Sequence, residues 1–394
     1  MTLRRLSVTL ACFTAALLCA ASARAAPLRM NELQVIGTHN SYHQEISEPE
    51  QDAYEALIRQ PGDYAQFLAY THVALADQLE HQSVRGGELD LWPDPQGGLY
   101  ADPLVRQALG LGPLPDPAWR TPGIKVIHSA DFDYNPSCVR FAACLQQIAT
   151  WSREHPGHVP LLYMLELKQS DSRAVDLLGG VEAPPWDGAA LDTMDREIRS
   201  VFSEHELITP DDVRRHGLTL EQSVLQRGWP TVGRTRGKIA FLLDNDPGPI
   251  RDAYVAGRPN LEGRATFTNS RPGFADAAFI KRNDPTGANL AQIQQLVGDG
   301  YLVRTRSDVP LATVLSGNTS QRDAALASGA QLVSTDFPLR GMSFRYGTDY
   351  FAQLPDAAPV RCNPVNAPGD CARRRLEPRD DTKDDVAEQR RSRR

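Results

Sequence analysis

The chain has 394 residues, of which 41% are hydrophobic and 23% charged, with 29 Gly, 29 Pro and six Cys. This composition is that of a globular protein and excludes collagen-like, coiled-coil and wholly disordered chains. The formal net charge of −7 gives no support to nucleic-acid binding, which normally needs a basic domain. Both ends of the chain are net basic, so the body between them is more acidic than the total indicates.

The first 25 residues have the pattern of a secretory signal peptide. Arg4 and Arg5 precede a mostly apolar run over 6–21, and the small residues Ala23 and Ala25 flank Arg24. A membrane anchor is the alternative, but about 16 apolar residues fall short of the roughly 20 that span a bilayer. We therefore expect a secreted or periplasmic protein whose mature chain starts near Ala26.

Cysteine spacing agrees with export. Cys12 and Cys19 would leave with the signal peptide, and an even number of Cys in an exported chain favours disulfides. Three pairings of the remaining four are possible, and the short spacings favour Cys138 with Cys144 and Cys362 with Cys371. Neither pair has the CxxC spacing of a zinc site.

The last residues, 372–394, contain hardly any apolar side chain to bury, so we expect a disordered charged tail. A basic patch for anionic surfaces is the alternative, which the interspersed acids weaken. The remaining segment, 26–371, is expected to form one domain.

Eight short aliphatic runs recur along that domain, and most of the segments between them are long enough for a helix. Such a pattern predicts parallel strands and a (β/α)8 barrel of the TIM type, possibly distorted and with long loops. The predicted strands are 33–37, 88–91, 124–128, 161–167, 238–243, 278–282, 301–305 and 331–335. Helical periodicity is clear over 137–151, 188–202 and 288–297, with Asp187 placed to cap the second of these.

Polar residues fall near the end of nearly every predicted strand. The carboxyl ends of barrel strands meet at one face, where active sites lie, so we expect these side chains to share one cup. Glu88 and Asp90 are two residues apart, as are Glu166 and Lys168, so each pair points to one side of the sheet. The residues concerned are His39, Asn40, Glu88, Asp90, His128, Glu166, Lys168, Asp244, Arg282, Arg304, Arg306 and Asp336.

This set of residues suits phosphodiester cleavage. Asn40, Glu88, Asp90 and Glu166 offer only oxygen ligands, which favours a hard cation such as Ca²⁺. His39 and His128 are candidates for proton exchange, and Lys168, Arg304 and Arg306 for contact with phosphate or a polyol. The alternative is that Glu88 and Asp90 form structural ion pairs with Arg304 or Lys168. His43, His155 and His158 are expected to have surface or capping roles.

Several segments together resemble a known enzyme family. IGTHNSYH at 36–43, GELDLW at 87–92, IKVIHSADFD at 124–133, WSREHPGHVPLLYMLELK at 151–168, YLVRTRSD at 301–308 and QLVSTDFP at 331–338 are similar to the secreted bacterial calcium-dependent phosphatidylinositol-specific phospholipase C family. The resemblance spans about residues 30–340 and implies a distorted barrel. It implies that His39 and His128 are catalytic and that Asn40, Glu88 and Asp90 bind Ca²⁺, with Glu166 a further candidate. In the implied reaction the inositol 2-hydroxyl attacks phosphorus and expels diacylglycerol, leaving a cyclic inositol phosphate.

Two other functions remain open. A glycerophosphodiester phosphodiesterase shares the barrel, two His and a Glu-x-Asp pair, but its first His is typically followed by Arg, whereas Asn40 stands here. A non-catalytic secreted barrel that binds inositol or glycans is the other, which the presence of both His39 and His128 disfavours.

The expected partners follow from the same resemblance. The substrate is expected to be a phosphoinositide or related diester, bound by a monomer during transient contact with a membrane surface. The loop after Trp92 also carries Tyr100 and Trp119, and serves either as a lipid-facing rim or lid or as scaffold packing.

Overall fold

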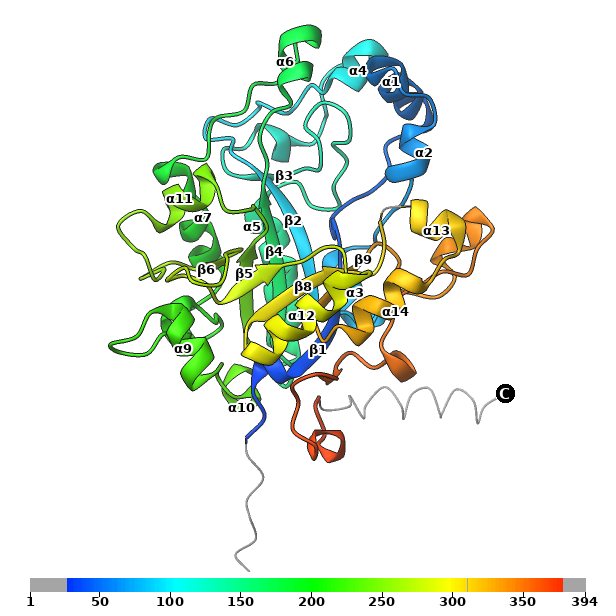
Figure 1. Cartoon of the computed structure of the whole chain (residues 1–394). Coiled ribbons are helices and arrows are strands. Elements are labelled where there is room, and N and C mark those ends of the chain that lie inside the picture. The colour runs from blue at the N-terminus through cyan, green and yellow to red at the C-terminus, as the bar shows by residue number, and fades with distance from the viewer. Residues whose placement is uncertain (1–26, 310, 378–394) are drawn as a thin grey trace, which may run out of the picture.

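The computed structural model describes residues 27–309 and 311–377, and Figure 1 shows a central group of strands surrounded by helices. The predicted signal peptide lies outside the described residues. Eight strands among those described follow one another as parallel neighbours. In ring order they are β1 (Leu33–Thr38), β2 (Gly86–Trp92), β4 (Leu161–Leu167), β5 (Ile239–Leu243), β6 (Thr266–Thr268), β7 (Phe279–Lys281), β8 (Leu302–Arg306) and β9 (Leu332–Thr335).

Backbone hydrogen bonds close this ring at the two places where the regular ladders stop. Between β1 and β2, the Arg85 amide donates to the Ile36 carbonyl oxygen at 2.8 Å. Between β6 and β7, the Ser270 amide donates to the Phe279 carbonyl oxygen at 3.1 Å. Glycine suits the first seam, because a Cβ on Gly37 of β1 would lie 3.0 Å from the carbonyl carbon of Gly86 in β2. The predicted (β/α)8 barrel is thus confirmed.

One predicted strand is wrong and one was missed. The 124–128 run forms only β3 (Lys125–Val126), which pairs antiparallel with the end of β2 and lies outside the ring. β2 instead pairs directly with β4, and the eighth strand of the ring is β6, a three-residue strand of sequence TFT between β5 and β7. Two of the three β6 residues are threonines, so the aliphatic pattern used to find strands passes over it.

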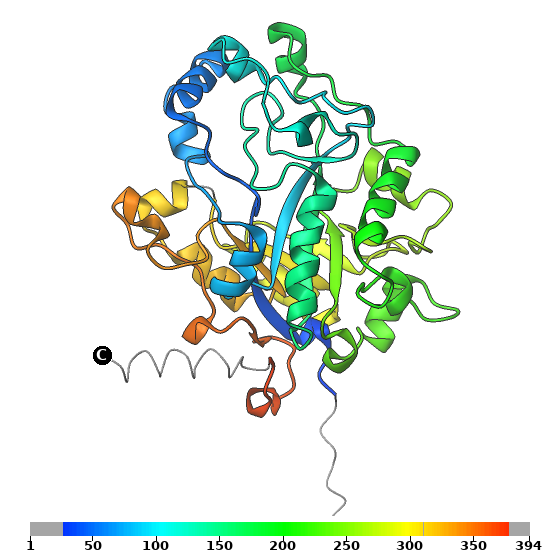
Figure 2. The same cartoon turned by 180° about the vertical axis from the view of Figure 1, so that it is seen from behind.

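Helices cover most of the barrel's outside, and Figure 2 shows α5 running along one side of it between α3 and α7. The predictions over 137–151, 188–202 and 288–297 are confirmed as α5, α7 and α12, and Asp187 caps α7 by accepting from the Ala190 amide. The connection from β6 to β7 holds no helix, which distorts the barrel. The α-helices are α1 (Glu48–Ile58), α2 (Asp63–Phe67), α3 (Leu75–His81), α4 (Leu104–Ala108), α5 (Phe141–Glu154), α6 (Ser172–Leu178), α7 (Gly188–Val201), α8 (Pro210–Val213), α9 (Leu220–Arg227), α10 (Val232–Thr235), α11 (Pro249–Val255), α12 (Ala288–Asp299), α13 (Ala312–Ser316) and α14 (Ser320–Ala327).

Two apolar cores stabilise the described chain. The larger one joins the strands to the surrounding helices, and the smaller one lies beneath the loops that follow the strands. Trp92, Tyr100 and Trp119 belong to the smaller core and are at most 4% exposed. The lipid-facing alternative for these three aromatic side chains is therefore wrong, and their role is scaffold packing.

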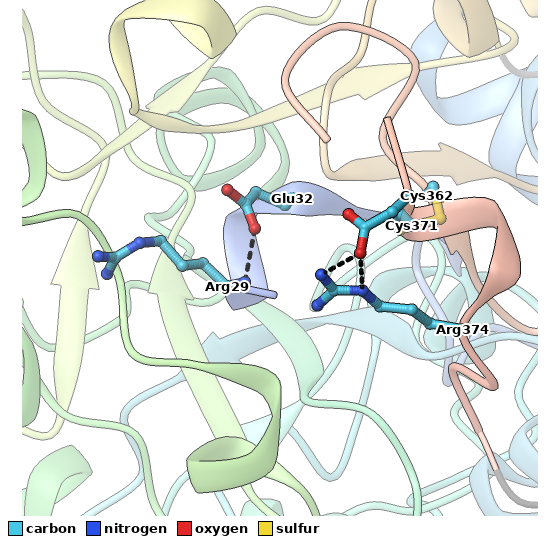
Figure 3. The surroundings of a disulfide bond; sticks show 6 residues. Arg29, Glu32, Cys362, Cys371 and Arg374 are labelled. Carbon is cyan, nitrogen blue, oxygen red and sulfur yellow. Dashed lines mark hydrogen bonds and ion pairs between the residues drawn. A yellow bond between two sulfur atoms is a disulfide. The ribbon is translucent and has the colours of Figure 1, made fainter. Parts of the chain in front are cut away.

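The amino-terminal end of the barrel is closed by the last described segment. The strand β10 (Arg361–Cys362) pairs antiparallel with the start of β1. Figure 3 shows the Cys362–Cys371 disulfide and Arg374, together with the Arg29 amide donating to Glu32. Arg374 donates to Asp370 at 2.7 Å. Both predicted disulfides are present, the other joining Cys138 to Cys144.

Residues 372–377 begin the segment that we expected to be disordered, yet they make specific contacts. The Glu377 carboxylate accepts hydrogen bonds from both Nε and Nη2 of Arg85, and Arg236 donates to the Leu376 carbonyl oxygen. Residues 378–394 of that segment lie outside the described residues. Across the described part of the chain, none of the helices combines the length and the apolarity needed to cross a bilayer.

Candidate active site

The carboxyl ends of the barrel strands gather the predicted polar residues at one face, the upper end in Figure 1. His39 follows β1 directly, Glu88 and Asp90 belong to β2, and Lys168 follows β4. Arg304 and Arg306 belong to β8. The shared cup expected from the sequence is therefore formed by neighbouring strands of one barrel.

His39 is oriented by the neighbouring strand β9. Its Nδ1 lies 2.9 Å from Oδ1 of Asp336, and its backbone amide donates to the Thr335 carbonyl oxygen at 2.9 Å. Its Nε2 lies 3.9 Å from Oε1 of Glu88, inside the cup. Burial and the adjacent Arg306 lower the pKa of His39 to about 3, against the opposing effect of Asp336. The lowered pKa thus favours the neutral imidazole.

His72 supports this arrangement from behind. It is fully buried, and its Nε2 donates to the His39 carbonyl oxygen at 3.0 Å. Burial alone would raise the pKa of Asp336, but His39 and His72 reverse that effect and lower it. Asp336 is consequently an ionised acceptor that fixes the His39 ring.

His128 reaches the same end of the barrel by a different path. It stands in the loop after β3, and its Nδ1 lies 2.8 Å from Oδ2 of Asp133, five residues further on. Its side chain is 26% exposed, against 12% for His39. Burial is the main cause that lowers the pKa of His128. Each of the two predicted histidines therefore has one ring nitrogen fixed by a buried aspartate.

An acidic cluster suited to a cation lies beside His39. One oxygen from each of Glu88, Asp90 and Glu166 lies within 4.8 Å of the others. Asp90 makes no aligned hydrogen bond with any described residue, and Asn40 Oδ1 is buried without a donor. Burial raises the pKa of Glu88 to about 7 and raises that of Asp90 well above its usual range. Crowded carboxylates and an unused amide oxygen fit a hard cation with oxygen ligands.

The ion pairs considered as an alternative are also present. Arg304 Nη2 lies 2.7 Å from Oε2 of Glu88, and Lys168 Nζ lies 3.1 Å from Oδ2 of Asp90 and 3.2 Å from Oε1 of Glu166. Arg304 is 1% exposed, so its guanidinium orients Glu88 from within the barrel. Arg306 lies 3.5 Å from Asp336 and keeps its Nε without a partner among the described residues.

Three other histidines test the surface or capping prediction. His155 caps the end of α5, since its Nδ1 lies 2.8 Å from the Trp151 carbonyl oxygen, which confirms the prediction. His158 is buried and bonded to Ser152, and His43 is fully buried between Tyr70 and Asp133, so for these two the prediction is wrong. In the sequence, His43 and Asp133 stand in the same motifs as His39 and His128, the one signal that could have identified them.

Comparison with known proteins shows the family and the fold of the chain. The family model described as "Phosphoinositide phospholipase C, Ca2+-dependent" matches residues 28–364. A calcium-dependent phosphoinositol-specific phospholipase C from a Pseudomonas species has a similar fold, with a TM-score of 0.50, 18% identity, and coverage of 85% of this chain and 95% of that one. The myoinositol complex of that enzyme matches at 17% identity with a TM-score of 0.50, covering 85% of this chain and 96% of that one.

A further match is a Ca²⁺-dependent phosphatidylinositol-specific phospholipase C from Streptomyces antibioticus. Its TM-score is 0.48 at 18% identity, with 79% of this chain and 95% of that chain covered. No curated protein matches the chain. Because the family model spans most of the sequence, the chain belongs to the Ca²⁺-dependent phosphoinositide phospholipase C family.

Proposed function

We propose that the protein cleaves phosphatidylinositol by attack of the inositol 2-hydroxyl on phosphorus, with His39 and His128 exchanging the protons. One observation carries this proposal: each imidazole has its Nδ1 held by a buried aspartate, which leaves Nε2 for substrate. General acid–base catalysis needs such an oriented nitrogen within hydrogen-bond reach of the reacting oxygen.

The position of each histidine supports a division of roles. His39 lies deeper, with Nε2 facing Glu88 of the acidic cluster, and takes the proton from the attacking hydroxyl. His128 is the more exposed ring and returns a proton to the oxygen of the departing diacylglycerol. The lipid product then leaves from the open side of the cup.

Asn40, Glu88, Asp90 and Glu166 are the residues that we propose to hold Ca²⁺. When bound there, Ca²⁺ supplies positive charge that stabilises developing negative charge on oxygen. Arg304 keeps Glu88 in place, while Lys168 and Arg306, which are more exposed, contact the phosphate. Among the three predicted substrate-binding cations, Arg304 is thus proposed to act indirectly.

Export and brief membrane contact belong to the same proposal. The two disulfides and the pattern of residues 1–25 support a secreted or periplasmic protein, which we propose acts as a monomer. Exposed apolar side chains on the loops around the cup supply the contact instead of the buried aromatics. Leu111, after α4, is 50% exposed and Leu177, on α6, is 72% exposed.

The test measures inositol phosphate released from phosphatidylinositol vesicles and from glycerophosphoinositol, each with and without a calcium chelator. We expect release from the phospholipid that stops on chelation and returns with added Ca²⁺. Preference for glycerophosphoinositol would favour the glycerophosphodiesterase alternative, and activity indifferent to chelator would contradict the metal assignment.

A further inference from the structure

A second buried histidine stands behind His128. His43, in the loop after β1, is fully buried, with Nδ1 2.9 Å from the Tyr70 carbonyl oxygen and Nε2 2.7 Å from Oδ2 of Asp133. A carbonyl oxygen and an ionised carboxylate can only accept hydrogen bonds, so both ring nitrogens must donate. The hydrogen-bond pattern therefore makes His43 an imidazolium cation.

Asp133 is the group shared by the two histidines. It is 1% exposed, and its Oδ2 accepts from both His43 Nε2 and His128 Nδ1, while Tyr64 donates its hydroxyl to Oδ1 at 3.2 Å. Burial opposes ionisation of this carboxyl, but the two histidines outweigh it and lower the pKa of Asp133. Three donors thus surround an ionised carboxylate.

The charge of His43 changes what Asp133 does to His128. A lone buried carboxylate strongly favours the protonated form of a bonded imidazole. Here the carboxylate already has a cation on the same oxygen, and Lys168 adds positive charge from the β4 side. Asp133 can therefore orient His128 through Nδ1. It favours the protonated form of His128 less strongly than a carboxylate bonded to His128 alone would.

We propose that His43 is a positioning residue for His128, because it fixes the shared carboxylate of Asp133, which in turn holds His128 Nδ1 and leaves Nε2 for the substrate. The functional consequence rests on the proposed role of His128, whereas the effect on the His128 ring does not. The charged groups facing the His128 ring are Asp133, His43 and Lys168. The Tyr64 hydroxyl donates to the Asp133 carboxylate from its other side.

The experiment follows the histidine rings directly by NMR in the full mature protein labelled with ¹⁵N-histidine, alongside the pH profile of inositol phosphate release. In the unaltered protein, His43 should carry protons on both nitrogens at pH 7. In His43→Gln, the pKa of His128 should rise by about one unit or more, because the carboxylate loses its cation. The alkaline limb of the activity profile should move upward by the same amount, as the proposed proton donor stays protonated longer.

The matched control is His158→Asn, which removes another buried histidine that also has two hydrogen bonds, at a site away from Asp133. It should leave the pKa of His128 and the alkaline limb in place. Tyr64→Phe removes one donor to Asp133 without changing a charge, and should give a smaller upward shift of the His128 pKa. This variant keeps the proposal testable if His43→Gln does not fold.

An unchanged His128 pKa in His43→Gln, or in Tyr64→Phe if the former is unfolded, would overturn the proposal. So would a His43 ring with one unprotonated nitrogen at pH 7. A shifted His128 pKa with an unmoved activity profile would support the positioning role and count instead against His128 as the proton donor.

Discussion

The two ends of the barrel differ in how their charged groups are partnered. At the carboxyl end, charged groups are buried in excess of their partners, as in the crowded Glu88, Asp90 and Glu166. At the amino-terminal end, the charges are paired and a covalent link holds the closing segment, as in Arg85 with Glu377 and Cys362 with Cys371. Such a division implies that one end carries reactivity at a cost in stability, and the other carries stability without a part in the reaction. Substitutions should therefore separate rate from stability according to the end at which they lie.

The largest effect is expected from His39→Ala. Loss of a general acid–base group should lower inositol phosphate release by about 10²- to 10⁴-fold. The fold should be retained, since His39 lies at the cup and not in either apolar core, although the unfolding free energy falls because Asp336 loses a donor. The exposed His81, on α3, provides the control as His81→Ala, and should keep its activity. Full activity of His39→Ala would contradict the proposal that the carboxyl end carries catalysis through His39.

Next in size is Asp90→Asn, which takes one charge from the proposed cation site. The Ca²⁺ concentration that gives half of the maximal rate should rise about 10-fold or more, because ligand charge tunes Ca²⁺ affinity. Calcium titration of the activity measures it, with the exposed Asp52→Asn as control. An unchanged calcium requirement would mean that Asp90 does not bind Ca²⁺ and serves only in its ion pair with Lys168.

Removing the Cys362–Cys371 disulfide, as Cys362→Ser with Cys371→Ser, sharpens the comparison from the other end. Closing so short a loop is expected to contribute about 2–3 kcal/mol to the unfolding free energy, measured by denaturant titration. Activity at 25 °C should stay within about twofold of the unaltered protein, since this end holds no proposed catalytic group. The Cys138–Cys144 pair, which follows the His128 loop, is the contrasting case, and its double Ser variant should lose both stability and activity.

Protonation of His158, just before β4, gives a pH test of the same end. Burial lowers the pKa of His158 to about 4, from about 6.5 in the unfolded chain. The unfolded chain therefore binds the extra proton first, so the native state loses stability as pH falls from about 6.5 to about 4. In His158→Asn this loss should be smaller by about 3 kcal/mol, measured as unfolding free energy against pH. Parallel curves for the two proteins would contradict the assignment.

The smallest effect is expected from Glu377→Gln. Arg85 retains hydrogen bonds to the Leu79 and Val84 carbonyl oxygens, so it is not left without partners. The loss should be about 1 kcal/mol in unfolding free energy, with no change in rate. Gln in place of the exposed Glu48 should cost less, and a rate defect in Glu377→Gln would break the separation between the two ends.

The sequence predicted the barrel because its longest strands are aliphatic and its polar residues stand at their ends. It could not place the strand that precedes His128 correctly, since a run such as IKVIH has the same pattern whether it pairs in the ring or antiparallel to β2. It also missed β6, a buried strand whose threonines do not match the aliphatic pattern. The roles of His43 and Asp133 depend on contact between residues 90 positions apart, which no local pattern in one sequence records.

The pairing of β1 has a consequence for how the chain folds. Its neighbours β9 and β10 are made some 300 residues later, with Val35 beside Leu332 and Leu33 beside Cys362. The first strand can contact β2 early, but its ladder partners are made only near the end of synthesis, so the ring cannot close on a nascent chain. A truncation before residue 332 should accumulate as an open, aggregation-prone sheet and not as a smaller barrel.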